Sequence, residues 1–267
     1  MSKIKDINHE ESNCKKCNKL IEGHNIHLHE GMCDDCFFKE SFSEDTPEKD
    51  LLSEFNSKGK CRLCEKECTG KEMKKHLIKC IKKIKNNALL LKAVEGPFFV
   101  YFSVPENKNL KDVDKFLRGV WLECCGHLSM FKIGKIYYIS NNTELDENEE
   151  TMDIKVDKVL REGVKCNYEY DFGTTTPLDI ECVSKIETES KTIEILARNN
   201  QPDFKCNECK SEATDICVYC KEEGTEFLCK KCGAKHKCEE TAILPVVNSP
   251  RIGMCGFTGE ECKLLNK

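Results

Sequence analysis

The sequence lacks a run of apolar residues long enough to cross a membrane, and its start, Met1-Ser2-Lys3-Ile4-Lys5-Asp6, leads into polar sequence rather than a secretory signal. Cysteine, in contrast, is abundant, with 21 among 267 residues. In a secreted chain this number would indicate disulfides, which form in oxidising compartments. We therefore expect a cytoplasmic protein with no membrane segment, whose reduced thiols bind metal.

The chain also lacks a large net charge, at −5, so the whole molecule is not expected to bind polyanions. The charge is nevertheless uneven. Between Lys58 and Lys92 there are 12 Lys and Arg against Glu65, Glu67 and Glu72, a local balance of +9, whereas residues 40–54 and 144–153 are acidic. This asymmetry indicates segments with separate roles.

The most informative stretch holds eight soft ligands near the C-terminus. Six of them form three Cys-x2-Cys pairs, and each such pair makes a tight knuckle whose thiolates can share one metal. Eight ligands predict two zinc ions. The predicted ligands are Cys206, Cys209, Cys217, Cys220, Cys229, Cys232, His236 and Cys238.

The pairing of these ligands has two solutions. Sequential pairing joins the first two knuckles, whereas cross-braced pairing, as in the B-box fingers that this spacing resembles, joins the first with the third and the second with His236 and Cys238. The seven residues between the first two knuckles favour the cross-brace. Cys255 and Cys262 remain open as alternative ligands if His236-x-Cys238 is too tight.

Two knuckles about fifteen residues apart near the N-terminus match a four-cysteine zinc ribbon or treble clef. The predicted ligands are Cys14, Cys17, Cys33 and Cys36. His24, His27 and His29 lie between them as alternatives, but four thiolates already complete a tetrahedron. Residues 1–42 are assigned to this ribbon and the acidic, Pro47-containing residues 43–57 to a linker.

A third metal pattern follows, with the ligands Cys61, Cys64, His76 and Cys80. Apolar residues at intervals of three and four predict a helix from about Lys71 to Lys85, on which His76 and Cys80 share one face. Cys68 falls outside the ligand spacing. Residues 58–92 thus form a Cys-Cys-His-Cys zinc finger with a basic helix.

This finger resembles two kinds of module, the nucleic-acid-binding finger and the ubiquitin-binding finger of DNA-repair ligases. The ubiquitin-binding type has Asp where this chain has Ile78. The basic face of the helix could contact phosphates, although a run of lysines is also typical of a solvated surface. The expected partner is a nucleic acid, bound through residues 58–92, or a protein. The oligomeric state is left open.

The middle of the chain, residues 93–201, has few cysteines and alternating apolar residues. We expect strands over 98–104, 130–139 with a turn at Gly134, 164–170, 178–183 and 192–197, and helices over 110–121 and 154–161. A stretch of this length can bury its own core. The predicted fold class is α+β, multi-domain, with a central α+β domain and small zinc modules at both ends.

Two segments of this domain carry a family resemblance. Trp121-Leu122-Glu123-Cys124-Cys125-Gly126-His127-Leu128-Ser129, followed by Tyr168-Glu169-Tyr170-Asp171-Phe172-Gly173, is similar to the plasmid pRiA4b open-reading-frame-three family, also known as IS1096 passenger TnpR-like. The resemblance covers about 40% of the chain. That family has no well-established activity, so it implies a domain type rather than a reaction.

Cys124, Cys125 and His127 are the candidates for chemistry. A Cys–His pair can supply a nucleophile and three such ligands can hold a metal, but adjacent strand residues point to opposite faces. We prefer a helix end with Gly126 as its cap and packed thiols. Asp171 is expected to bind backbone amides in a turn where Gly173 has a positive φ.

Zinc here is explained by folding, because small modules with few large apolar residues cannot fold on their own cores. The sequence therefore predicts about four structural zinc ions and no catalytic residue. Residues 202–267 are assigned to the C-terminal two-zinc module. The expected function is that of a non-enzymatic adaptor or regulator. The alternatives are a purely protein-binding module and a metal or thiol enzyme at Cys124.

Overall fold

A computed structural model describes residues 11–22, 32, 36, 57–81, 87–141, 145–221 and 223–265. The chain divides into two compact units, Met1–Glu48 and Lys49–Lys267. In the first unit, β1 (Glu11–Asn13) and β2 (Leu20–Glu22) form an antiparallel hairpin. Cys33, the histidines at 24, 27 and 29, and the linker at 43–56 lie outside the described residues.

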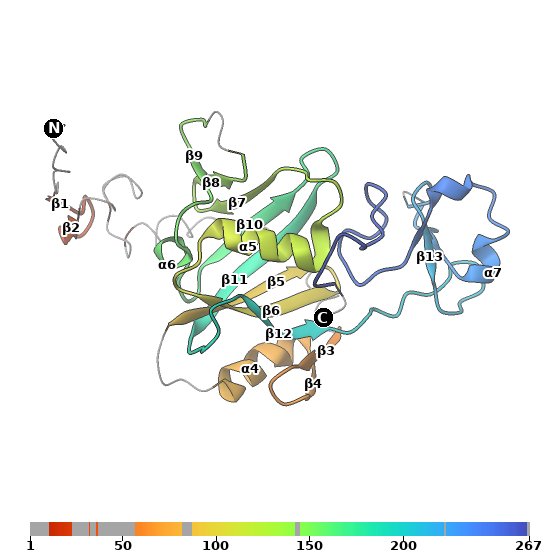
Figure 1. The fold of residues 1–267 in the computed structure, drawn as a ribbon, viewed down its shortest axis with the longest axis horizontal. Coiled ribbons are helices and arrows are strands. Elements are labelled where there is room, and N and C mark those ends of the chain that lie inside the picture. The colour runs from red at the N-terminus through yellow and green to blue at the C-terminus, as the bar shows by residue number, and fades with distance from the viewer. Residues whose placement is uncertain are drawn as a thin grey trace, which may run out of the picture. The chain divides into compact units, whose positions relative to one another are not determined.

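The second unit is built on a ten-stranded sheet (Figure 1). Its strand order is β4-β3-β12-β6-β5-β11-β10-β7-β8-β9, and all neighbours are antiparallel except β8 and β9. The strands are β3 (Lys58–Cys61), β4 (Glu67–Thr69), β5 (Ala88–Glu95), β6 (Phe98–Pro105), β7 (Ser129–Ile133), β8 (Ile136–Ile139), β9 (Glu149–Thr151), β10 (Lys165–Tyr170), β11 (Thr176–Ile186) and β12 (Glu194–Asn199). The mixture of strands with a few helices agrees with the predicted α+β class.

The helices are short and have identifiable ends. They are α4 (Gly70–Cys80), α5 (Leu110–Leu117), the π-helical η1 (Arg118–Leu122) and α6 (Val156–Val159). The Thr69 hydroxyl accepts a hydrogen bond from the Glu72 amide, and the Glu72 carboxylate accepts one from the Thr69 amide. This capping box starts α4, and the extended backbone of Ile81 ends it before the predicted Lys85.

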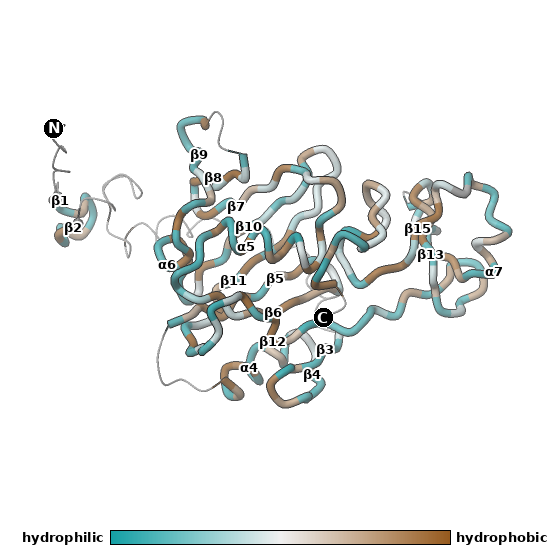
Figure 2. The backbone as a smooth tube through the Cα atoms, in the orientation of Figure 1, coloured by the Kyte–Doolittle hydropathy of each residue, from teal (hydrophilic) through white to brown (hydrophobic). Residues whose placement is uncertain are grey.

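The two faces of the sheet are covered by different helices. Every residue of β6 is buried, although alternate side chains of a strand point to opposite faces. Phe99 and Tyr101 belong to the same apolar cluster as Met73 and Leu77 of α4. Phe102 lies on the other face, where the centre of its ring is 4.7 Å from the centre of the Phe116 ring of α5. Apolar stretches accordingly concentrate on the central strands (Figure 2).

The region predicted to be a zinc finger is joined to this sheet. β3 pairs with β12 along Ala197–Cys61, Arg198–Lys60 and Asn199–Gly59. A Cβ on Gly59 would lie 2.3 Å from the carbonyl oxygen of Arg198, so only glycine permits this approach. Residues 88–92, assigned to the finger from the sequence, lie in β5. The finger and the central domain therefore share one sheet and one apolar cluster.

The C-terminal residues first leave the central sheet and then return to it. Residues 215–245 contain a three-stranded sheet of β13 (Asp215–Cys217), β14 (Phe227–Leu228) and β15 (Ile243–Pro245), with α7 (Lys230–Gly233) and the 3-10 turn η2 (Glu240–Ala242). Residues 248–265, here named the tail, then lie against η1, where the Leu264 amide donates to the Gly119 carbonyl. Among the described residues, no helix is long and apolar enough to span a membrane.

Candidate metal centres

Five groups of cysteine and histidine side chains converge in the described residues, and within each group the ligand atoms all lie within 4.8 Å of one another. They are the N-terminal cluster (Cys14, Cys17, Cys36), the finger cluster (Cys61, Cys64, His76, Cys80), the first C-terminal cluster (Cys206, Cys209, Cys229, Cys232), the second C-terminal cluster (Cys217, Cys220, His236, Cys238) and the tail cluster (Cys124, Cys125, His127, Cys255). Each group could hold a metal ion, and thiolates with imidazoles are the ligands that zinc prefers.

The Cys-x2-Cys spacing produces the same backbone turn in three places. In each turn the residue after the second cysteine has a positive φ, and its amide donates to the carbonyl of the first cysteine. The three donors are Asn18, Glu65 and Lys210, with φ of 58°, 62° and 62° and N–O distances of 3.0, 2.8 and 2.9 Å. A non-glycine residue in this region costs of order 1 kcal/mol, which ligation of the two thiolates can offset.

The distances between ligand atoms fit a tetrahedron. Zinc–sulfur bonds of about 2.3 Å at tetrahedral angles place two sulfurs about 3.8 Å apart. The Sγ atoms of Cys220 and Cys238 are 3.8 Å apart, and those of Cys209 and Cys229 are 3.6 Å apart. These separations match a shared central cation and are far longer than the disulfide bond length of about 2 Å.

In the C-terminal clusters the ligands group in the cross-braced manner that the spacing favours. The first and third knuckles converge, and the second knuckle meets the pair His236 and Cys238, with Cys220 Sγ 3.4 Å from His236 Nε2. β13 ends at Cys217, the first cysteine of the second knuckle, and pairs with β14, which leads into the third knuckle. The short His236-x-Cys238 spacing thus places both side chains in one group.

Thiols of one cluster have opposite pKa shifts. A hydrogen bond from the Ser211 hydroxyl, helped by the Cys232 amide, lowers the pKa of Cys229 to about 6. The hydrogen bond from the Cys232 thiol to that thiolate, together with one involving Cys209, raises the pKa of Cys232 to about 12. Zinc binds the thiolate form, so a divalent cation between these thiols would take the place of their protons.

The finger cluster is placed by the β3–β4 hairpin and α4. Cys61 is the last residue of β3 and Cys64 lies in the turn that follows, while His76 and Cys80 lie one helical turn apart on α4. Cys64 Sγ is 3.2 Å from His76 Nε2. Cys68 is buried in the apolar cluster and is not among the converging ligands. The structure thus brings together the four ligands that the sequence grouped.

The N-terminal cluster contains three of the four cysteines that the sequence grouped. Cys14 and Cys17 lie in the turn between β1 and β2, and Cys36 joins them. The fourth predicted ligand, Cys33, is outside the described residues.

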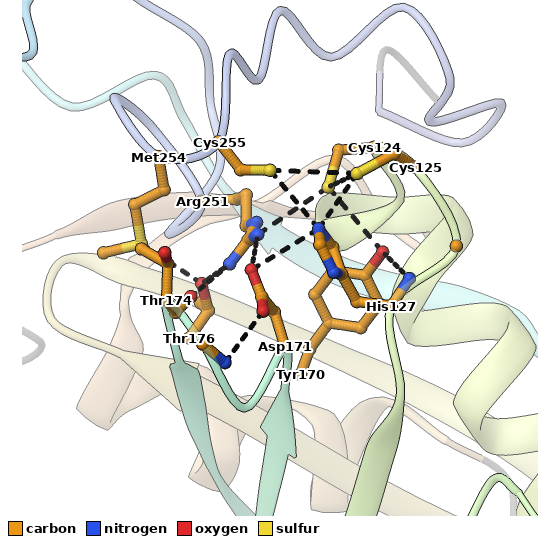
Figure 3. A network of polar contacts seen from close by, with 12 residues as sticks. Cys124, Cys125, His127, Tyr170, Asp171, Thr174, Thr176, Arg251, Met254 and Cys255 are labelled. Atoms are coloured by element: carbon orange, nitrogen blue, oxygen red, sulfur yellow. Dashed lines mark hydrogen bonds and ion pairs between the residues drawn. The ribbon is translucent and has the colours of Figure 1, made fainter.

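The tail cluster combines segments that are far apart in the sequence (Figure 3). Cys125 Sγ lies 3.8 Å from the Sγ of both Cys124 and Cys255, and 2.9 Å from His127 Nε2, while His127 Nε2 is 3.3 Å from Cys255 Sγ. The two sulfur–sulfur distances equal the tetrahedral value of about 3.8 Å. Cys125 and Cys255 are exposed, and no ligand of this cluster is fully buried.

A buried ion pair lies beneath the tail cluster. Nη2 of Arg251, a fully buried residue, donates to Asp171 Oδ2 at 2.5 Å and approaches Cys124 Sγ at 3.7 Å. Nη1 donates to the Thr174 carbonyl at 2.6 Å and to the Thr176 hydroxyl at 3.0 Å. Burial raises the pKa of Asp171, but the Arg251 hydrogen bond and the Thr174 and Gly173 amides outweigh it and lower that pKa. The positive guanidinium therefore lies next to a thiol that metal binding would ionise.

A second set of contacts orients the histidine. The His127 amide donates to Tyr170 Oη at 3.3 Å, and the two rings meet edge to face at 5.7 Å. Tyr170 Oη donates to Glu123 Oε1, which also accepts the Gly126 amide, and Arg118 Nε donates to Glu123 Oε2 at 2.7 Å. Such contacts behind a ligand fix its orientation.

The sequence-based interpretation of this region requires corrections. Cys124 and Cys125 are half-buried and exposed rather than packed, and residues 124 and 125 form a bend rather than a strand, so both thiols reach the same group. Asp171 binds the Gly173 amide as expected, but Asp171 itself has the positive φ of 66°, and Gly173 does not. Cys255, which the sequence offered only as an alternative ligand of the C-terminal module, lies instead with Cys124, Cys125 and His127.

A shallow cavity of about 90 Å³ adjoins the tail cluster. Its walls include three of the ligands, Cys124, Cys125 and Cys255, together with the carboxylates of Glu123, Glu260 and Glu261. Solvent therefore reaches this group from the side of the tail.

Comparisons with known proteins assign no family to this chain. No family model and no curated protein matches it. Among solved structures, it is similar to a protein of unknown function, MM3350, from Methanosarcina mazei Go1. The likeness has 16% sequence identity and a TM-score of 0.35 and covers 41% of this chain and 67% of that one.

Proposed function

We propose that this chain is a zinc-stabilised, non-enzymatic adaptor or regulatory protein. The observation that carries the proposal is the convergence of four soft ligands in the finger cluster and in each C-terminal cluster. Four protein ligands complete a tetrahedron and leave no position for a substrate, which is typical of structural zinc. With the N-terminal cluster, for which Cys33 is the fourth ligand predicted from the sequence, this gives four structural zinc ions in a reducing cytoplasm.

Zinc also accounts for the folding of the C-terminal module. Its buried apolar cluster consists of Cys217, Leu228 and Ala242, and of the five partly buried residues packed against it three are cysteines. So small a core does not stabilise an independent module, whereas each structural zinc contributes about 10–16 kcal/mol of apparent binding free energy.

Native mass spectrometry of the full chain tests this proposal. The expected mass includes one zinc for each of these four clusters, and a double substitution such as Cys61→Ser with Cys64→Ser should remove one. A chain that retains its fold with two zinc ions or fewer would contradict the proposal.

The surfaces of the knuckles support a role in binding proteins. Leu63 and Tyr219 lie between the cysteines of two knuckles and are 50% and 61% exposed, and Leu20, beside a third, is 59% exposed. An exposed large apolar side chain on a rigid turn is suited to anchor a partner. The double substitution Leu63→Asp with Tyr219→Asp should abolish binding of the proteins that bind the wild-type chain. Unchanged binding would exclude these two side chains as anchors.

Nucleic acid is the second candidate partner. Lys71, Lys75 and Lys79 of α4 are exposed and recur every four residues, so they form one stripe. Lys74, in contrast, pairs with Glu181 of β11. Binding to DNA or RNA should fall steeply with salt and weaken on Lys71→Ala/Lys75→Ala/Lys79→Ala. The control Lys111→Ala/Lys115→Ala/Lys158→Ala removes equal charge from other exposed helical positions; equal weakening would exclude a specific stripe.

The assignment of the central domain to the pRiA4b-like type is likewise a proposal. Its support is that the two segments of the resemblance lie together, since Tyr170 pairs with Ser129 and the Asp171 amide donates to the Leu128 carbonyl. An experimental structure of a family member should show the strand order β12-β6-β5-β11-β10-β7. A different order would contradict the assignment.

A further inference from the structure

The tail has an irregular backbone that needs an explanation. It contains no strand or helix among its described residues, and Gly253, Gly256 and Gly259 all have positive φ. Cys255 shares this conformation, with φ of 47°, although it carries a side chain. Asp171, on the other side of the same cluster, also has a positive φ. A strained backbone conformation of this kind persists only where several surrounding interactions hold it in place.

Specific contacts hold the tail against the central domain. The Ser249 hydroxyl donates to the Trp121 carbonyl at 2.7 Å, and Arg198 donates to the carbonyls of Asn248 and Leu265. Cys262 is buried, and its thiol donates to the Arg118 and Glu123 carbonyls. Cys255, in contrast, is exposed and directs its thiol at Cys125 and His127. The two tail cysteines therefore have different roles.

We propose that Cys124, Cys125, His127 and Cys255 bind a zinc ion that clasps the tail to the central domain. We name this group the clasp site. It is additional to the four structural sites under the proposed function, because it shares no ligand with any of them.

The donor set fits zinc. Three thiolates and one imidazole are soft ligands that complete a tetrahedron. With Zn²⁺ they carry a net charge of −1, and Arg251 lies 3.7 Å from Cys124 Sγ to balance it. The bond from Cys255 reaches 130 residues along the chain from Cys125, so the ion links the tail covalently, through coordination bonds, to the segment after η1.

The exposure of the site sets it apart from the other clusters. Each of the other groups contains at least one buried ligand, whereas this group contains none. The adjoining cavity gives small chelators access. The clasp zinc is therefore expected to exchange before the others.

Cys255→Ser, compared with Cys262→Ser in the full chain, tests the proposal. Native mass spectrometry should show one zinc fewer for Cys255→Ser and no loss for Cys262→Ser, whose hydroxyl can donate to the same carbonyls. Hydrogen exchange of residues 248–265 should rise at least tenfold in Cys255→Ser. An unchanged zinc count in Cys255→Ser would overturn the site.

Cys125→Ser provides the second arm, because that thiol is exposed and lies on the other segment. It should cause the same loss of one zinc and the same opening of the tail. Loss of zinc with a fully protected tail would overturn the clasping role. In the cobalt-substituted protein, each of the two variants should show a thiolate-to-cobalt absorption that is lower than that of the wild type by the contribution of one site. These results separate the clasp from the structural sites, since ligand substitutions there leave the Cys255-dependent zinc in place.

Discussion

The finger cluster and the clasp site use the same kinds of ligand but are assembled in opposite ways. Cys64 and His76 of the finger are 12 residues apart, whereas Cys125 and Cys255 of the clasp are 130 apart. Closing the longer loop in an unfolded chain costs about 2 kcal/mol more. The finger can therefore be organised locally, whereas the clasp requires the folded central domain and the docked tail.

The surroundings of the finger cluster and of the clasp site also differ. α4 of the finger packs Met73 and Leu77 against the central sheet, so the finger is held by apolar contacts as well as by its ligands. Two ligands of the clasp are exposed and two are half-buried, and the tail is held by hydrogen bonds together with the buried side chains of Ile252, Phe257 and Leu265. The finger ligands thus lie beside the apolar core, whereas a metal at the proposed clasp would support a connection at the surface.

Removal of all zinc should have the largest effect, and it should distinguish the regions whose folding depends on metal from those whose folding does not. With a chelator, amide protection in β13, β14 and β15 should disappear, because each zinc contributes about 10–16 kcal/mol and that module has a small core. β5, β6 and β11 should keep their protection. Hydrogen exchange measures both regions in one sample; persistent protection of β13–β15 would show that zinc does not stabilise that module.

Leu77→Ala tests the apolar support of the finger. Leu77 is fully buried between α4 and the sheet, and truncation of such a side chain costs about 2–5 kcal/mol. Denaturant unfolding should report this loss for the central domain as a whole. Lys75→Ala, on the exposed face of the same helix, is the control and should change stability little. If only the finger is destabilised, the two regions do not share one core.

Gly59→Ala tests the joint between the finger and the central sheet. The added Cβ would lie 2.3 Å from the Arg198 carbonyl and 2.5 Å from the Phe99 ring. Overpacking of this kind costs about 1–3 kcal/mol. Gly119→Ala is the matched control, because its Cβ would meet only Leu264 at 3.6 Å. Equal melting temperatures for the two variants would contradict the close approach of β3 and β12.

Tyr170→Phe should have the smallest effect and should act on the clasp alone. The hydroxyl accepts from the His127 amide and donates to Glu123, and loss of such a contact behind a ligand lowers metal affinity about tenfold or more. A chelator competition on the Cys255-dependent zinc measures this change. Tyr168→Phe, which loses a hydrogen bond to Asp114 away from the clasp, should leave that affinity unchanged.

Local features of the fold could be predicted from the sequence. The strands near 98–104 and 130–139 and the Gly134 turn follow from short-range patterns and lie where expected. Helix α4 ends earlier than its periodicity indicates, because Ile81 leaves the helix and packs at the rim of the apolar cluster. The order of the strands, with β3 beside β12, could not be predicted, since pairing across more than a hundred residues leaves no local pattern.

The sequence by itself indicated the knuckles, because the Cys-x2-Cys spacing is typical of metal sites, and the same turn forms after Cys14, Cys61 and Cys206. It also indicated the cross-brace, because the short loop between the first two knuckles restricts their geometry. Only the tertiary structure brought Cys255 to Cys124, Cys125 and His127, and only it covered one face of the central sheet with α4. Both depend on how distant segments pack, and packing is decided by the whole apolar core rather than by the spacing of a few residues.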